Sequence, residues 1–189
     1  MARRYDHTPE QLRELASASG TRMMVEVGYH EFSARGVATR MGYTVGTLYN
    51  LFENLDMFIL HVNALTLDEW YGNLSARLAQ PDHDPIDALA RGYYEFAQQN
   101  YNRFLALFEH QMEEVPDWYQ PKLHRFFDLV EETLRAKGMR QERASHLAKA
   151  LWAGVHGVTV LSLSGKLQLL GADDADTLMK TVLTGLLTE

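Results

Sequence analysis

The 189-residue sequence contains no cysteine, which excludes disulfide bonds, thiolate metal sites and cysteine nucleophiles. Its longest nearly apolar run, residues 151–163, is too short to span a bilayer and includes His156 and Ser162. The arginines near the N-terminus are not followed by the apolar stretch of a secretory signal. We therefore expect a protein of the reducing cytoplasm without a membrane partner.

Strand signals are almost absent, because the sequence has no alternating β-branched runs and no Asn-Gly or Asp-Gly turns. Helix boundaries are frequent instead. Residues 8–11 read as a helix start with a capping box, and Asp84 precedes Pro85 as the cap of a later helix. Between them, a long helix is expected over about 54–79. The pattern predicts an all-α fold of about nine helices.

The first helix has small residues, Ala16, Ser19 and Gly20, on one face. They predict a close approach of a second helix; a helix weakened by its glycine is the alternative. Further breaks are expected near Asn100, at 115–117, at 137–138 and at 171–173. The last two long helices are expected over 140–170 and 175–187.

Motifs of enzyme chemistry are missing as well. The sequence has no His-Glu-x-x-His, no phosphate-binding glycine loop and no Gly-x-Ser-x-Gly, and its eight histidines are scattered. We therefore expect neither an enzyme nor a metal or cofactor site. An all-α enzyme is the alternative, and only its scattered carboxylates would support it.

Residues 33–52 carry the pattern with the clearest functional meaning. Ser33 can cap a short helix that Gly42 ends, and Thr44 can cap a second helix whose inward face is Leu48 and Phe52. Two short helices joined by a tight glycine-containing turn form a helix-turn-helix. A small helical hairpin without further function is the alternative from geometry alone.

The second of these helices turns small or hydrogen-bonding side chains outward, a face that can enter a DNA major groove. Gly46 permits close backbone approach, hydroxyl groups can reach phosphates, and Asn50 can bind a base edge, adenine above all. Arg35 of the preceding helix can meet the flanking phosphates. The predicted DNA contacts are Ser33, Arg35, Thr44, Val45, Gly46, Thr47, Tyr49 and Asn50.

The net charge of −7 is unevenly distributed. Residues 1–60 are nearly neutral, whereas residues 61–189 carry most of the negative charge. A DNA-binding end needs positive potential only locally, so the overall charge does not exclude DNA. We expect modest, salt-sensitive affinity.

The same segment resembles the DNA-binding domain of the tetracycline-repressor (TetR) family. The resemblance rests on Gly28-Tyr29, Ser33, Arg35, Ala38, Arg40, Gly42, Gly46-Thr47-Leu48-Tyr49 and Phe52. It implies a DNA-binding domain over 1–53, a ligand-binding and dimerisation domain over 54–189, and a ligand-responsive repressor that binds a palindromic operator as a homodimer.

The segment also departs from the family pattern at several positions. The family usually has Lys at the positions of Val45 and Leu55, His at Asn50 and Tyr at Leu51. The missing lysines remove phosphate contacts. A helical small-molecule-binding protein with degraded DNA binding is therefore the alternative function.

In the C-terminal half, residues 151–157 resemble a subgroup with a Trp-His-Gly signature. Trp152 and His156 lie on one helical face, where they can either fill the core or line a cavity for a small apolar or aromatic effector, with Gln111 and His156 as polar anchors. The predicted pocket residues are Tyr93, Phe96, Phe108, Gln111, Met112, Trp118, Phe127, Trp152 and His156.

In the TetR family the last two long helices form a four-helix bundle with the partner subunit. The resemblance therefore places the dimer interface on the last two long helices. The predicted interface residues are Val155, Leu161, Leu178, Val182 and Leu186. A core buried within one chain would show the same apolar spacing.

Overall fold

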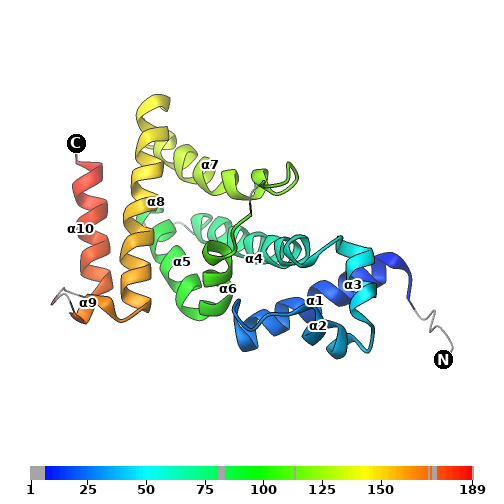
Figure 1. Ribbon diagram of the computed structural model, residues 1–189. Coiled ribbons are helices and arrows are strands. Elements are labelled where there is room, and N and C mark those ends of the chain that lie inside the picture. Colours follow the sequence, from blue (N-terminus) through cyan, green and yellow to red (C-terminus); the bar gives the residue numbers. More distant parts are fainter. Residues whose placement is uncertain (1–6, 81–83, 113, 170, 172–173, 189) are drawn as a thin grey trace. The chain divides into compact units, whose positions relative to one another are not determined.

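The computed structural model describes residues 7–80, 84–112, 114–169, 171 and 174–188 (Figure 1). Within these residues the chain forms ten helices and no strand, which confirms the predicted all-α class. In chain order the helices are α1 (Pro9–Val27), α2 (Ala34–Met41), α3 (Val45–Phe52), α4 (Leu55–Leu78), α5 (Pro85–Gln99), α6 (Tyr101–Glu109), α7 (Gln120–Ala136), α8 (Gln141–Leu163), α9 (Lys166–Leu169) and α10 (Ala175–Leu187).

The chain divides into two compact units, and α4 runs from the first into the second. Unit 1 comprises Met1–Leu67 and Asn100–Val115, and therefore includes α6. Unit 2 comprises Asp68–Gln99 and Pro116–Glu189. These two compact units do not coincide with the domain boundary at 53/54 that the sequence predicts. That boundary separates a DNA-binding from a ligand-binding domain, and it stays a prediction.

In unit 1, α1, α2, α3, the first half of α4 and α6 surround one core. The capping box at Thr8 is confirmed: its side chain accepts from the Gln11 N–H, and the Gln11 side chain accepts from the Thr8 N–H at 2.8 Å. The α6 helix joins this core through Ala106, whose carbonyl accepts from Asn63 Nδ2 at 3.1 Å.

The small residues on α1 face α4, as predicted. Ala16 and Ser19 are almost fully buried, and a Cβ on Gly20 would lie 2.7 Å from Val62 Cγ2 and 2.8 Å from Phe58 Cζ. The glycine therefore sets how closely α1 and α4 pack.

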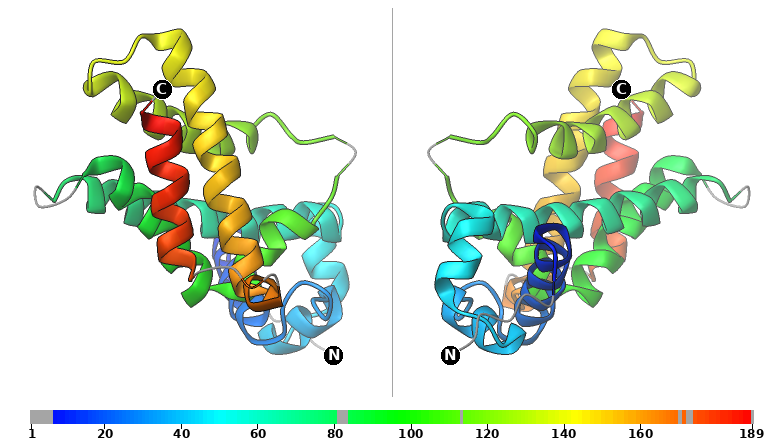
Figure 2. Two further views of the ribbon diagram at one scale, coloured as in Figure 1. Left: turned by 90° about the vertical axis from the view of Figure 1, so that its left-hand side faces the viewer. Right: turned by 90° about the vertical axis from the view of Figure 1, so that its right-hand side faces the viewer.

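In unit 2, α8 and α10 lie side by side in Figure 1 and in both views of Figure 2, and α5 and α7 also pack on α8. The α8–α10 contact is close at Gly154, where a Cβ would lie 2.6 Å from Val182 Cγ1. Burial of the apolar faces of these helices stabilises the unit.

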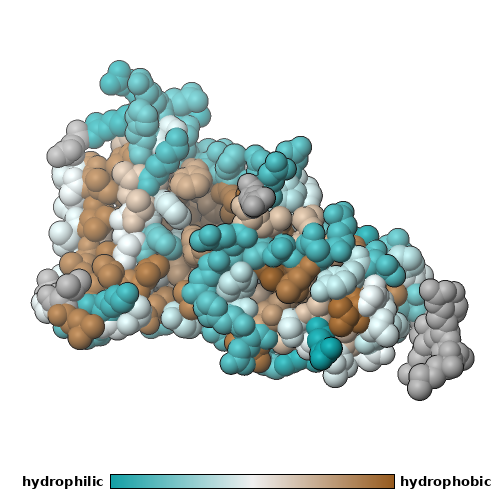
Figure 3. Space-filling model, viewed as in Figure 1, coloured by the Kyte–Doolittle hydropathy of each residue, from teal (hydrophilic) through white to brown (hydrophobic). Residues whose placement is uncertain are grey.

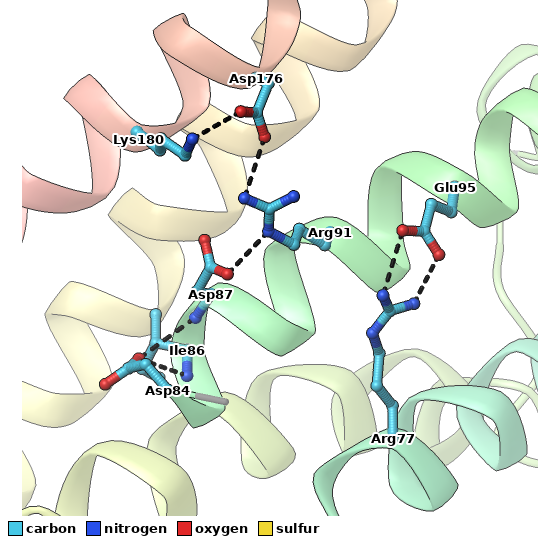
Figure 4. A network of polar contacts seen from close by, with 8 residues as sticks. All are labelled: Arg77, Asp84, Ile86, Asp87, Arg91, Glu95, Asp176 and Lys180. Carbon is cyan, nitrogen blue, oxygen red and sulfur yellow. Dashed lines mark hydrogen bonds and ion pairs between the residues drawn. The ribbon is translucent and has the colours of Figure 1, made fainter. Parts of the chain in front are cut away.

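Ion pairs at the surface of unit 2 join α5 to its neighbours (Figure 4). Arg91 forms ion pairs with Asp87 at 2.7 Å and with Asp176 of α10 at 3.1 Å. Arg77 of α4 forms a bidentate ion pair with Glu95. Because these side chains are partly exposed, the ion pairs add little to the free energy of unfolding.

The helix expected over 140–170 is wrong in length, since α8 ends at Leu163 and the short α9 follows. Gly165 has φ +70°, a left-handed conformation that interrupts the helix. Residues 172–173 of the expected break at 171–173, like residues 81–83 before Asp84, lie outside the described residues.

Among the helices that the structure describes, none combines the length and the apolar character that a membrane-spanning segment needs.

The packing at Gly20 generates a prediction. Gly20→Ala should lower the free energy of unfolding by about 1–2 kcal/mol, because overpacking against Phe58 and Val62 outweighs the gain in helix propensity. Gly72→Ala is the matched control, since nothing lies within 4 Å of its added Cβ, and it should stabilise by about 0.5–1 kcal/mol. Urea unfolding of both variants tests this, and equal stabilisation would contradict the close α1–α4 contact.

Candidate functional site

The α2–turn–α3 segment has the helix-turn-helix geometry expected from the sequence. Ser33 Oγ accepts from the Gly36 N–H at 3.2 Å, and Gly42 ends α2 in the left-handed conformation with φ +74°. Thr44 occupies the N-cap position of α3, but its predicted side-chain cap is absent. Its hydroxyl lies 3.2 Å from the Thr47 hydroxyl instead.

The α3 helix has one buried and one exposed face. Leu48 and Phe52 are almost fully buried, and the Phe52 ring centroid lies 4.7 Å from that of Phe58. The predicted DNA contacts lie elsewhere: Arg35, Thr44, Gly46, Tyr49 and Asn50 are exposed, and Ser33, Val45 and Thr47 are half-buried. The face is thus open to solvent, and its role in DNA binding stays a prediction.

The charge on this surface comes from arginines alone, because residues 33–52 contain no carboxylate. Arg40 is paired with Glu26 of α1 at 2.6 Å. Arg35 is exposed and forms no ion pair with any residue that the structure describes. Arg35 is therefore the cation of residues 33–52 that pairs with no carboxylate of the described residues.

Unit 2 contains a small apolar cavity bordered by α4, α5, α7, α8 and α10. Its volume is about 60 Å³. The lining residues are Leu74, Ile86, Leu89, Ala90, Tyr93, Phe126, Phe127, Leu129, Val130, Leu151, Trp152, Val155 and Leu183.

A polar cluster lies at this cavity. Tyr93 Oη lies 2.8 Å from His156 Nδ1. The Trp152 and His156 rings are stacked, with centroids 5.2 Å apart. Burial raises the pKa of Tyr93 far above its usual range and lowers the pKa of His156. Both side chains are therefore neutral at pH 7.

The predicted pocket residues divide into three groups. Tyr93, Phe127 and Trp152 line the cavity, and His156 contacts Tyr93 and Trp152. The remaining predicted residues do not line it. Phe96 stacks on Trp70, Trp118 is exposed beside Tyr119, and Phe108, Gln111 and Met112 belong to unit 1.

None of the aliphatic residues that line the cavity was predicted from the sequence as a pocket residue. Ile86 and Leu89 follow the cap at Asp84 on one face of α5, and this spacing is the signal that could have indicated them. The lining residues of α7 carry the ordinary spacing of any buried helix face, so nothing in the sequence singles them out.

The predicted interface residues lie on α8 and α10. Val155 is 5% exposed and lines the cavity, whereas Leu161, Leu178, Val182 and Leu186 are half-buried in the single chain. Hydrophobic side chains gather along α10 and around the end of α8, on the left of Figure 3. Contact of this face with a second chain stays a prediction.

Histidine and carboxylate side chains are the groups of this chain that could ligate a metal ion. Across the described residues, no group of three or more could hold a metal ion.

Known proteins are similar to this chain over both of its compact units. A family profile described as the tetracyclin repressor-like C-terminal domain matches residues 86–186. None of the curated proteins matches the sequence.

Solved structures match over almost the whole chain. The candidate regulatory protein SCO4313 is 20% identical with a TM-score of 0.74, covering 96% of this chain and 97% of its own. FadR of Thermus thermophilus, a TetR-family repressor solved with lauroyl-CoA, is 18% identical with a TM-score of 0.68 and 93% of each chain covered. BioQ, solved with its double-stranded DNA operator, is 17% identical with a TM-score of 0.64, covering 94% and 98%. At these identities the likeness concerns the fold.

The half-buried His156 generates a prediction about pH. The pKa of His156 is lowered in the folded chain, so below about pH 6.5 the unfolded state takes up a proton that the folded state resists. The free energy of unfolding should therefore fall as the pH drops from 7.5 to 5.5, and His156→Gln should make this decrease smaller. Urea unfolding at the two pH values tests this, and an unchanged decrease in the variant would contradict it.

Proposed function

The chain belongs to the tetracyclin repressor-like family, whose C-terminal domain profile covers residues 86–186, and on this premise we propose that it is a ligand-responsive transcriptional repressor. In this proposal a homodimer binds a palindromic DNA operator and releases it when a small apolar or aromatic effector binds. Trp152, His156 and Gly157 further support the Trp-His-Gly subgroup as the C-terminal type.

The observation that carries the proposal is the exposed face of α3. Gly46 lets the backbone approach the major groove, the Tyr49 hydroxyl can bind phosphate, and Asn50 can bind a base edge. Arg35 supplies a cation at the flank of this face. No carboxylate in residues 33–52 opposes the approach of DNA.

Two-fold pairing follows from the length of α3. A helix of eight residues reads few base pairs, so specific binding needs two copies about 34–36 Å apart, one turn of DNA. The apolar side chains along α10 supply a surface for this pairing (Figure 3). An isologous interface uses the same surface on both subunits, which suits two adjacent helices such as α8 and α10.

The effector would bind at the cavity of unit 2. A ligand shifts binding to DNA only if it prefers one of two conformers, and strong switching needs a preference on the order of 10²–10⁴. An apolar cavity between helices, beside a few polar groups, is the usual setting for a small ligand.

A helical small-molecule-binding protein without DNA binding is the second candidate function. The observation that favours it is the scarcity of cations near α3, where Arg40 is already paired with Glu26 and Val45 is apolar. The two functions share the cavity and differ in whether α3 binds DNA.

Selection from a pool of random duplexes, followed by variants on the recovered sequence, tests DNA binding. Asn50→Ala should lose discrimination at one base pair of each half-site, worth about 1–3 kcal/mol. Tyr49→Phe should instead weaken binding to all sequences by about 0.5–1.5 kcal/mol, because it removes a hydroxyl predicted to bind phosphate. Fluorescence anisotropy with matched and mismatched duplexes measures both effects.

The control for these variants is Asn73→Ala, which removes an exposed amide from α4 and should leave DNA affinity unchanged. If Asn50→Ala altered neither affinity nor preference, the assigned groove face would be wrong. Failure to enrich any palindrome would favour the second candidate function.

The proposed dimer generates a separate prediction. Leu178→Glu places a charge in the half-buried apolar face of α10 and should shift the protein from dimer to monomer in sedimentation velocity. Thr184→Glu, on the exposed polar face of the same helix, is the control and should stay dimeric. Dimers of equal stability in both variants would show that pairing uses another surface.

A further inference from the structure

A contact between His7 and Tyr43 joins two segments of unit 1 that lie far apart in the sequence. The His7 Nδ1 atom lies 2.8 Å from the Tyr43 hydroxyl, and the two rings meet edge to face with their centroids 6.1 Å apart. The contact is exposed, so it adds little to the core. Its effect is to hold the chain in front of α1 against the turn between α2 and α3.

Tyr43 has a fixed position in that turn. It follows the left-handed Gly42, and its N–H donates to the Ala38 carbonyl at 2.9 Å. Its half-buried ring packs on the core of unit 1. The next residue, Thr44, is a predicted DNA contact at the N-cap of α3. A segment held at the Tyr43 hydroxyl therefore begins beside the surface that is proposed to face DNA.

His7 is held on its other side by the start of α1. It directly precedes Thr8, whose side chain accepts from the Gln11 N–H in the capping box. The two reciprocal hydrogen bonds of this box hold Thr8 in an extended conformation, with φ −70° and ψ 164°. The cap and the contact with Tyr43 together place the end of the preceding segment at the turn.

That preceding segment carries two adjacent cations, Arg3 and Arg4, and one carboxylate, Asp6. Residues 1–6 lie outside the described residues. A chain spans at most about 3.3–3.6 Å per residue, so Arg3 can lie up to about 14 Å from His7. Duplex DNA carries one negative charge per about 1.7 Å of its axis. Several phosphates of a duplex that faces α3 are therefore within reach of the two arginines.

The helix-turn-helix itself offers few cations for these phosphates. Of the two arginines in residues 33–52, Arg40 is paired with Glu26 at 2.6 Å, which leaves Arg35. Cations supply much of the affinity of a protein for the DNA backbone, whereas contacts with base edges supply the specificity. Two arginines held beside the turn would make up for this scarcity.

We propose that Arg3 and Arg4 bind DNA phosphates beside the groove that α3 faces, and that His7 and Tyr43 are positioning residues that hold their segment at the turn. This inference rests on the proposed function in taking α3 as the DNA-binding helix. Because Asp6 offsets one of the two charges, each segment neutralises about one phosphate. With Arg35 of each subunit, a dimer then neutralises about four phosphates.

The salt dependence of operator affinity tests the role of the arginines. In fluorescence anisotropy with the palindromic duplex recovered by selection, Arg3→Ala combined with Arg4→Ala should weaken binding by about ten- to hundredfold at 0.1 M salt. The slope of log affinity against log salt should become less steep by about 2. Arg3→Lys combined with Arg4→Lys should preserve affinity and slope, because lysine also neutralises phosphate.

Arg140→Ala combined with Arg143→Ala is the matched control. It removes the same charge from two exposed arginines of unit 2, at the start of α8, and should leave operator affinity within about twofold.

A double-mutant cycle tests the anchor. Tyr43→Phe removes the hydroxyl and should weaken operator binding by about two- to tenfold in the unmodified chain. After Arg3→Ala and Arg4→Ala the same change should alter affinity by less than about twofold, since no anchored cation is left to lose. Tyr101→Phe, which removes an exposed hydroxyl of α6 in unit 1, is the control and should change neither chain.

Unchanged affinity and slope after Arg3→Ala and Arg4→Ala, or a loss that the two lysines do not restore, would overturn the inference and leave the proposed function in place. Equal losses from Tyr43→Phe in both chains would overturn the anchor, because a tyrosine that only stabilised the turn would act in both. Absence of DNA binding by the unmodified chain would contradict the proposed function and this inference together.

Discussion

Burial of Leu48 and Phe52 is the constraint on which the DNA-facing surface depends. A helix of eight residues is unstable alone, so the position of α3 comes from its packing. The Phe52 ring contacts Phe58 of α4 and lies 5.7 Å below the Arg13 guanidinium of α1. These contacts join α3 to two longer helices and leave its opposite face in solvent. Because α4 continues into unit 2, the helix that anchors α3 also contributes to the other compact unit.

Much of the fold could be predicted because its signals are local. Capping at Thr8 and Ser33, the left-handed Gly42 and the cap at Asp84 each depend on residues within three or four positions. The same locality explains the two errors. The Thr44 hydroxyl contacts the Thr47 hydroxyl instead of capping a backbone N–H. Both partners lie within a few residues of Thr44, so the sequence does not show which of them it contacts. The interruption after α8 at Gly165 lies in a run that otherwise favours helix.

The candidate site could be predicted only in part, because its remaining members depend on contacts across long stretches of chain. The segment with Phe108, Gln111 and Met112 belongs to unit 1, where Asn63 binds a carbonyl 43 residues away. Helical spacing alone cannot assign a segment to one unit or the other. Tyr93, Phe127 and Trp152 were found because aromatics line cavities as well as cores, but the same reasoning selected Phe96, which stacks on Trp70.

The salt dependence of operator affinity tests the central claim most directly. If α3 binds DNA mainly through uncharged donors, with Arg35 as the cation of each half-site, a dimer neutralises about two to four phosphates. The logarithm of the association constant should then fall against the logarithm of salt concentration with a slope of about −2 to −4. Such a slope on a palindromic duplex would support the account. Absence of binding to any duplex at low salt, or a slope near −10, would contradict it.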